Sequence, residues 1–234
     1  DNAKIIVRRG GRLIMNNTTA TSIECPDARW PGVRVEGTTA ELAQSGTAQG
    51  RFWLTNGSVI ENAVVGTWCA REHTNGTVDP AYYGGMVRSF SSTYRNCISG
   101  VRVETYHRFS NMGVELDNLS LFSNTAFRTT SGWPAGPAPF RHAQVADCTG
   151  VSFINCNWVN EIPLSFPVTQ RGRGIVSRRA PFRCVGFMNA NNRFENLEVG
   201  ALVMQMPVGQ LYTMDGMTFH NNFKGVVDMG TRDA

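Results

Sequence analysis

Met217 to Met229 reads MTFHNNFKGVVDM, and nearly the same pattern recurs upstream. Each copy places an apolar or aromatic residue two positions before an Asn, and usually a Gly four positions after that Asn. The clearest copies are Ser58–Gly66 (SVIENAVVG), Ser92–Gly100 (STYRNCISG) and Asn192–Gly200 (NRFENLEVG), with a less complete copy at Val151–Val159 (VSFINCNWV) and a degenerate one at Thr125–Gly132 (TAFRTTSG) that keeps the Phe and loses the Asn. The chain is therefore built from repeats.

The spacing of these repeats predicts a stack of coils. The recurring apolar positions are 34, 33, 26, 41 and 25 residues apart, at Ile60, Tyr94, Phe127, Phe153, Phe194 and Phe219. Apolar runs are short and are interrupted by Gly, Asn or Ser, which excludes helical repeats with apolar residues at three- and four-residue spacing. A basic coil of about 25 residues with several strands per turn is typical of a parallel solenoid. We therefore expect one all-β domain over residues 1–234 with about eight coils, and the longer gaps carry loops.

The Asn and Phe positions are interpreted as structural. Stacked coils repeat each corner at strand spacing, about 4.8 Å, and Asn tolerates the left-handed backbone that a corner requires. Asn62 is expected to align with Asn96, and a second run interrupted at Thr129 is expected from Asn155, Asn196 and Asn221. The predicted internal aromatic column consists of Phe127, Phe153, Phe194 and Phe219.

Composition restricts the function classes. The formal net charge of +4 is modest and spread along the chain, so it gives no argument for nucleic-acid binding. No window reaches the roughly 18 consecutive apolar residues of a membrane-spanning helix. The six cysteines form no CxxC pair, which argues against zinc-ribbon and thioredoxin-type sites. They are interpreted as small buried residues, and a disulfide such as Cys148–Cys184 is left open.

Three insertions are expected to carry any contact surface, because the coils themselves are committed to stacking. They are Arg71–Tyr83, the Pro-rich Thr129–Arg141 and the Arg-rich Glu161–Cys184. The last two are the better candidates. Their candidate ligand contacts are Trp133, Arg141, His142, Arg171, Arg173, Arg178 and Arg179. The arginines either bind an anionic glycan or a lipid headgroup, or form a solvated basic loop.

The residues contain no recognisable catalytic or metal-binding motif. HExxH, GxSxG and a phosphate-binding Gly motif are absent, and we expect no metal and no cofactor. His142, at a predicted loop-to-strand junction, is either a base or a surface residue, and His220 is expected to face solvent. A glycosidase requires two facing carboxylates, for which Glu115, Asp117 and Asp147 are the only plausible donors.

The repeats resemble a known group of proteins. The segments Gly84–Val87, Tyr94–Val101, Val151–Cys156, Gly172–Val176, Arg193–Gly200 and Phe219–Val226 are similar to the right-handed parallel β-helix regions of large surface and secreted proteins of Bacteroidota. Trp30–Gly37 and Gly57–Ala63 resemble the opening coils of that group. The resemblance implies a right-handed β-helix, export by the type 9 secretion route and display within a large adhesin-like protein, and it supplies no catalytic motif. Both ends of the chain look internal, so we expect a segment of a larger protein.

These observations favour a non-enzymatic, extracellular β-helix segment that acts as a rigid stalk or adhesive spacer. Its expected partners are a surface glycan or other cell-envelope and secretion proteins. The alternative is a carbohydrate-active or carbohydrate-binding β-helix of the polysaccharide lyase or glycosidase kind. A third interpretation, a phage-type tail spike, requires a trimer.

Overall fold

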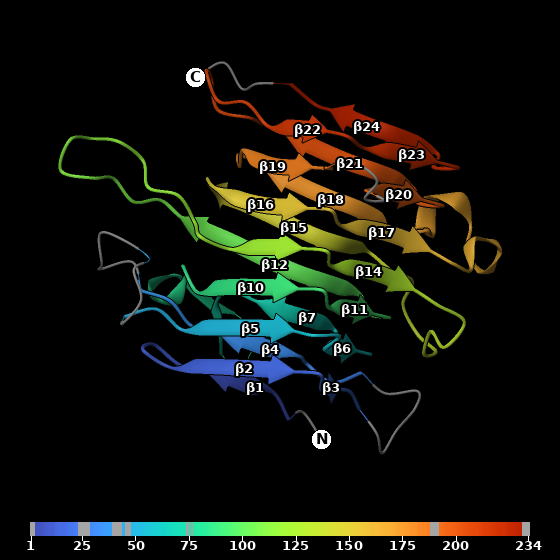
Figure 1. Ribbon diagram of the computed structural model, residues 1–234, viewed down its shortest axis with the longest axis horizontal. Helices are drawn as coiled ribbons and strands as arrows, with labels where there is room; N and C mark the ends of the chain where they lie inside the picture. Colours follow the sequence, from blue (N-terminus) through green and yellow to red (C-terminus); the bar gives the residue numbers. More distant parts are fainter. Residues whose placement is uncertain are drawn as a thin grey trace.

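The computed structural model describes residues 3–22, 29–38, 44, 48–73, 75, 77–187 and 192–230. Short strands in this part of the chain turn repeatedly through three sheets and return above their starting point (Figure 1). Every pairing between successive coils is parallel, and each coil passes through the second, the third and then the first sheet. This is the parallel β-helix that the repeat predicts.

The first sheet has eight strands and the other two have seven each. The first sheet contains β1 (Ile5–Val7), β4 (Val33–Val35), β7 (Val65–Trp68), β12 (Ser99–Tyr106), β15 (Arg141–Cys148), β18 (Arg173–Arg178), β21 (Val199–Met204) and β24 (Lys224–Asp228). The second contains β2 (Arg12–Asn16), β5 (Arg51–Thr55), β10 (Met86–Phe90), β13 (Leu121–Ser123), β16 (Val151–Ile154), β19 (Phe182–Val185) and β22 (Thr213–Asp215). The third contains β3 (Thr19–Ala20), β6 (Val59–Glu61), β11 (Thr93–Arg95), β14 (Ala126–Thr129), β17 (Asn157–Asn160), β20 (Arg193–Glu195) and β23 (Thr218–His220).

The insertions leave the stack at its corners. An antiparallel hairpin of β8 (Arg71–Glu72) and β9 (Val78–Asp79) leads into the 3-10 turn η1 (Pro80–Tyr82). The predicted insertion Glu161–Cys184 is too long, because it contains β18 and most of β19; the loop covers only 161–172 and includes η2 (Pro163–Ser165) and η3 (Val168–Gln170). Residues 107–120 form a further long loop that the repeat spacing did not reveal.

Left-handed residues turn the chain between sheets. At the corner after the third sheet, Asn62, Asn96, Asn196 and Asn221 have φ values of 56°, 55°, 58° and 51°, a region that Asn occupies at low cost. Asn221 Nδ2 donates to Asn196 Oδ1 at 2.6 Å. These four residues thus turn the chain at one corner of the stack. Where the loops 130–140 and 161–172 leave the same corner, the corresponding residues are Thr129 and Asn160, which end strands β14 and β17.

An aromatic column fills the coil beneath the third sheet. Its members stack nearly parallel, with ring centroids 5.2, 5.8, 4.3 and 5.0 Å apart. They are Tyr94, Phe127, Trp158, Phe194 and Phe219. Such stacking keeps large apolar area out of water in the coils from Tyr94 to Phe194, whereas Phe219 at the end of the column is 37% exposed.

The prediction that Phe153 and Asn155 belong to this column and corner is wrong. Phe153 lies in β16 of the second sheet and stacks on Phe122 at 5.1 Å. Asn155 turns the chain between the second and third sheets (φ 52°), together with Asn56 and Asn124. In this coil Trp158 occupies the column position that was assigned to Phe153, and Asn160 occupies the corner position that was assigned to Asn155. The error arose because apolar-x-Asn describes two different corners equally well.

Glycines at the start of the first-sheet strands make room for the column. A Cβ at Gly200 would lie 2.6 Å from both the Gly225 carbonyl oxygen and the Phe219 ring. Gly66, Gly100 and Gly174 face the rings of Tyr94, Phe127 and Phe194 in the same way. At these four positions a side chain would collide with the aromatic column or the next coil, which accounts for the Gly there.

We expect Gly200→Ala to lower the free energy of unfolding by about 1–3 kcal/mol, because the added methyl overpacks the column. Gly132→Ala is the matched control, since its Cβ would have no neighbour nearer than 3.5 Å. Urea denaturation followed by circular dichroism measures both. Equal stabilities for the two variants would contradict this account of the glycines.

Candidate functional site

The outer face of the first sheet carries a cluster of polar side chains in its middle coils. In β12, Val101 and Val103 point into the core, so Arg102 and Glu104 point outward. Parallel pairing places Gln144 beside Arg102 and Arg141 beside Ser99. Residues that are about 40 positions apart in sequence thus become neighbours on one surface.

Glu104 is the centre of this cluster. Its side chain accepts hydrogen bonds from Trp68 Nε1 at 2.7 Å, Arg102 Nη2 at 2.7 Å and Gln144 Nε2 at 2.5 Å. The residue is only 7% exposed, and burial of a carboxylate requires such charge-assisted partners. The negative charge of Glu104 is therefore compensated by donors within the cluster, chiefly by the guanidinium of Arg102.

An aromatic wall borders the cluster on the side of the N-terminal coils. The Trp68 ring lies beneath the guanidinium of Arg102 at 3.8 Å, and the guanidinium of Arg34 lies 5.1 Å away. Val78 of the hairpin and Tyr83 pack against the small cluster of Val65, Trp68 and Ala70. The hairpin is thus held against the first sheet, and Val78 extends the apolar border of the polar cluster.

Arg141 is the cation of this surface that lacks a counter-ion. Among the described residues no carboxylate forms an ion pair with it, and its Nε is buried without a hydrogen-bond partner. Its guanidinium lies 4.5 Å from the centre of the Phe140 ring. Burial lowers the pKa of Arg141 to about 10, helped by the nearby charges of Arg102 and Arg173 and opposed by Glu104. A guanidinium with this pKa keeps its charge at neutral pH.

These side chains surround a hollow of about 370 Å³. We call it the Arg141 groove. It is lined by Trp68, Val78, Tyr83, Arg102, Glu104, Thr105, Arg141, Gln144, Ala146, Asp147 and Arg178. Asp147 in the lining pairs with Arg178 at 3.4 Å and with Arg179 at 2.6 Å, so the surplus charge of the groove lies on Arg141. Such a groove can hold an anion beside an aromatic wall.

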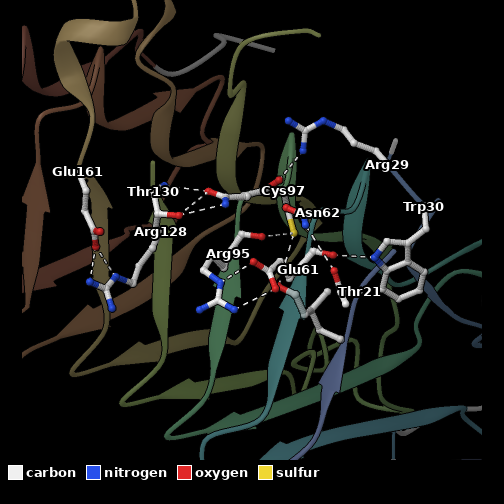
Figure 2. A network of polar contacts seen from close by, with 12 residues as sticks. Thr21, Arg29, Trp30, Glu61, Asn62, Arg95, Cys97, Arg128, Thr130 and Glu161 are labelled. Atoms are coloured by element: carbon white, nitrogen blue, oxygen red, sulfur yellow. Dashed lines mark hydrogen bonds and ion pairs between the residues drawn. The ribbon is translucent and has the colours of Figure 1, made fainter. Parts of the chain in front are cut away.

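The third sheet provides a contrast, because the charges on its outer face are paired. Figure 2 shows Arg95 in a two-pronged contact with Glu61, at 2.8 and 2.9 Å, and Arg128 paired with Glu161. Trp30 Nε1 donates to the Glu61 carbonyl oxygen at 2.7 Å. Each arginine in the described strands of this sheet therefore has a carboxylate partner, Arg193 with Glu195 included.

The structure brings together only part of the predicted contact set. Arg141 and Arg173 are register partners, and Arg178 lies on the same strand as Arg173. Arg173 pairs with Glu198 at 3.3 Å, while Arg179 forms the adjacent corner.

Trp133 and Arg171 lie outside the lining of the groove. The Trp133 ring meets Phe166 edge-on at 5.9 Å and lies 4.1 Å from the Arg29 guanidinium, so it ties the two corner loops together. Arg171 precedes β18, and its carbonyl oxygen accepts from Asn160 Nδ2 at 3.4 Å.

His142 is neither a surface residue nor a residue of the groove. It is 4% exposed and its ring lies 6.4 Å from that of Phe127, inside the coil. In the neighbouring coils the equivalent residues are Gly100 and Gly174. Because those glycines face the aromatic column, the imidazole of His142 also points toward the column. Burial lowers the pKa of His142 to about 4.

The three carboxylates considered as catalytic donors, Glu115, Asp117 and Asp147, have different surroundings. Glu115 contacts His107 at 2.7 Å within the loop 107–120, whereas Asp147 is held by arginines and Asp117 lines a separate hollow with Arg183. His220 is exposed, as expected, and lies 3.4 Å from Glu195. Within the described ranges no three His, Cys, Asp or Glu side chains are grouped so as to hold a metal ion.

The cysteines that the structure describes are buried free thiols. They are Cys69, Cys97, Cys148, Cys156 and Cys184, and Cys25 lies outside the described residues. The Cys148–Cys184 disulfide that the sequence left open is not formed. Burial raises the pKa of Cys97 and of Cys156 to about 12, so both remain protonated core residues.

Sequence reasoning missed Trp68, Arg102, Glu104 and Gln144. The alternation of Arg102 and Glu104 with Val101 and Val103 is a signal that would place both side chains outside, but nothing in the pattern pairs this strand with Gln144. That pairing depends on the intervening loops 107–120 and 130–140, whose lengths hide the register.

Comparison with known proteins adds no function. No family model, curated protein or solved structure matches the chain. None of the described helices is long and apolar enough to cross a membrane.

The buried His142 predicts a pH-dependent stability. The unfolded chain takes up this proton near pH 6.5 and the folded chain only near pH 4. Acidification through this range therefore favours unfolding, by on the order of 3 kcal/mol in total. We expect His142→Phe to remove this component, measured as the difference between the two proteins in urea denaturation from pH 7 to pH 4. Parallel pH profiles would contradict the assignment.

Proposed function

We propose that the chain is a non-enzymatic, extracellular β-helix segment that serves as a rigid adhesive spacer and binds an anionic surface glycan in the Arg141 groove. The observation that carries the proposal is the half-buried guanidinium of Arg141, which has no carboxylate partner among the described residues. A charge held in this way is stabilised when a ligand supplies the counter-ion.

The groove matches the chemistry of an acidic sugar. Arg141 supplies a donor fork for a carboxylate or sulfate. The ring of Phe140, which is 48% exposed, offers a flat apolar surface next to it. Gln144 lines the hollow, and its Oε1 has no hydrogen-bond partner among the described residues, which suits a hydroxyl group of a sugar. The hollow of about 370 Å³ lies at the small end of ligand pockets.

The spacer role follows from the way in which the strands are used. Nearly every described strand pairs with the coils before and after it, and aromatic stacking runs through the interior. Such a stack keeps its surface groups at fixed spacing. The groove consequently stands on strands and not on mobile loops.

The extracellular setting is supported by the resemblance of the repeats to β-helix regions of Bacteroidota surface proteins. On that basis the chain belongs to a larger protein exported by the type 9 route and displayed at the cell surface, where glycans and other envelope proteins are its partners. Free buried thiols such as Cys97 and Cys156 are core residues and are compatible with this setting.

The alternative is carbohydrate cleavage, for which the observation in favour is the presence of Glu104 and Asp147 in the lining of the groove. Glycoside hydrolysis requires one carboxyl group as acid and a second as base or nucleophile. Glu104 is bonded to Arg102 and Asp147 to Arg179. Both carboxylates are thus held by cations, which favours binding over cleavage.

We expect Arg141→Gln to weaken the binding of a uronic-acid oligosaccharide by about tenfold or more, because a charge-assisted contact is lost. Isothermal titration calorimetry measures the affinity, with a neutral oligosaccharide of equal length as the ligand control. Arg95→Gln is the matched variant, since Arg95 is paired with Glu61 on the third sheet, and it should bind as the wild type does. Unchanged affinity in Arg141→Gln would overturn the proposal.

Incubation of the protein with acidic and neutral polysaccharides is expected to release neither reducing ends nor unsaturated products, with or without calcium. Product that appears with the wild type and disappears in Glu104→Gln would make the groove an active site and refute the non-enzymatic assignment.

A further inference from the structure

The outer face of the second sheet carries a second set of arginines, in the N-terminal coils. Arg12 of β2 pairs in register with Arg51 of β5, and Trp53 of β5 pairs with Arg88 of β10. In each strand the neighbouring side chains Leu13, Phe52 and Val87 point into the core, so these four residues project from the same side. We call them the Arg12–Arg88 strip.

None of the three arginines has an ion pair with a described carboxylate. The Nε atoms of Arg51 and Arg88 and the Nε1 of Trp53 are buried without a hydrogen-bond partner. The seven strands of this sheet contain a single acidic residue, Asp215 in β22, at the opposite end of the stack (Figure 1). The strip is therefore a cationic surface without internal compensation.

The strip also has features that suit sugar rings. The Arg12 guanidinium lies 5.2 Å from the centre of the Trp53 ring, which forms a mixed cation and indole surface. Beside it runs a row of amide and hydroxyl groups, in which Asn56 Nδ2 donates to Asn16 Oδ1 at 2.7 Å and Thr55 Oγ1 donates to the same oxygen at 3.3 Å. Charge, a flat apolar ring and polar groups thus lie next to one another.

We propose that the Arg12–Arg88 strip binds a linear anionic polysaccharide that runs across the coils. Successive coils repeat at about 4.8 Å, so Arg12, Arg51 and Arg88 present charges along the stack to a polymer that carries repeated sulfate or carboxylate groups. A bilayer fits less well, because Ile14, at 44% exposed, is the only large apolar side chain of β2, β5 and β10 that is strongly exposed.

This contact is separate from the Arg141 groove, since the two surfaces belong to different sheets. Two contacts on one rigid rod raise the overall affinity for a polymer or a glycan-coated surface without any new interaction. The strip does not depend on the groove being a sugar site.

The test uses heparin, a sulfated polysaccharide, immobilised on a surface, and it measures affinity as a function of salt. We expect Arg51→Gln combined with Arg88→Gln to weaken binding by at least about tenfold and to make the slope of log affinity against log salt shallower by about two. Arg95→Gln combined with Arg128→Gln removes the same charge from the paired third sheet and should leave the slope within experimental error of the wild type. An equal effect of both double variants would overturn the proposal, because it would show that only net charge matters.

Two further measurements decide what kind of partner the strip takes. Trp53→Thr is expected to lower the affinity for heparin without changing the salt slope, because it removes a stacking surface and no charge. Anionic vesicles and duplex DNA are compared at equal charge concentration. Loss of vesicle or DNA binding in the Arg51 and Arg88 variant, with heparin binding retained, would refute a polysaccharide partner. The Arg51→Gln and Arg88→Gln comparison is repeated in an Arg141→Gln background, where the strip should still make the slope shallower by about two; this separates failure of the strip from failure of the groove.

Discussion

Parallel pairing between coils is the interaction on which the structure depends. Each strand obtains its backbone hydrogen bonds from the coils above and below it, and no coil buries its own apolar side chains. Side chains of one kind therefore recur in columns. The Tyr94, Phe127, Trp158, Phe194 and Phe219 column, the left-handed Asn corners and the glycines that face the rings are three parts of the same arrangement.

The same pairing decides what the outer faces can do. On the third sheet, stacking brings Glu61 against Arg95 and Arg128 close to Glu161, so its charges are satisfied within the protein. On the first sheet it brings Arg102 and Gln144 to Glu104 and leaves Arg141 with no counter-ion among the described residues. Binding capacity in this fold thus arises where the charges of neighbouring coils do not cancel.

Loops border the Arg141 groove without supplying most of its chemistry. Val78 of the β8–β9 hairpin and Tyr83 after η1 pack against the cluster that contains Trp68 and line the Arg141 groove. The loop 130–140 ends on Phe140, whose ring lies beside Arg141. Loop residues, which the sequence predicts as the contact surface, lie at the border of the groove. The cations themselves stand on strands, where their spacing is set by backbone hydrogen bonds.

The sequence by itself determined the parallel β-helix, because the fold follows from a local pattern that repeats. It did not determine register. Apolar-x-Asn describes two corners, so Phe153 was assigned to the column that Trp158 fills. The Arg141 groove could not be predicted as a unit for the same reason: Arg102 and Gln144 become neighbours only through a pairing across loops of variable length. Which residues share a face was decided by tertiary structure, since strand alternation orients a side chain but only coil-to-coil hydrogen bonding selects its neighbours.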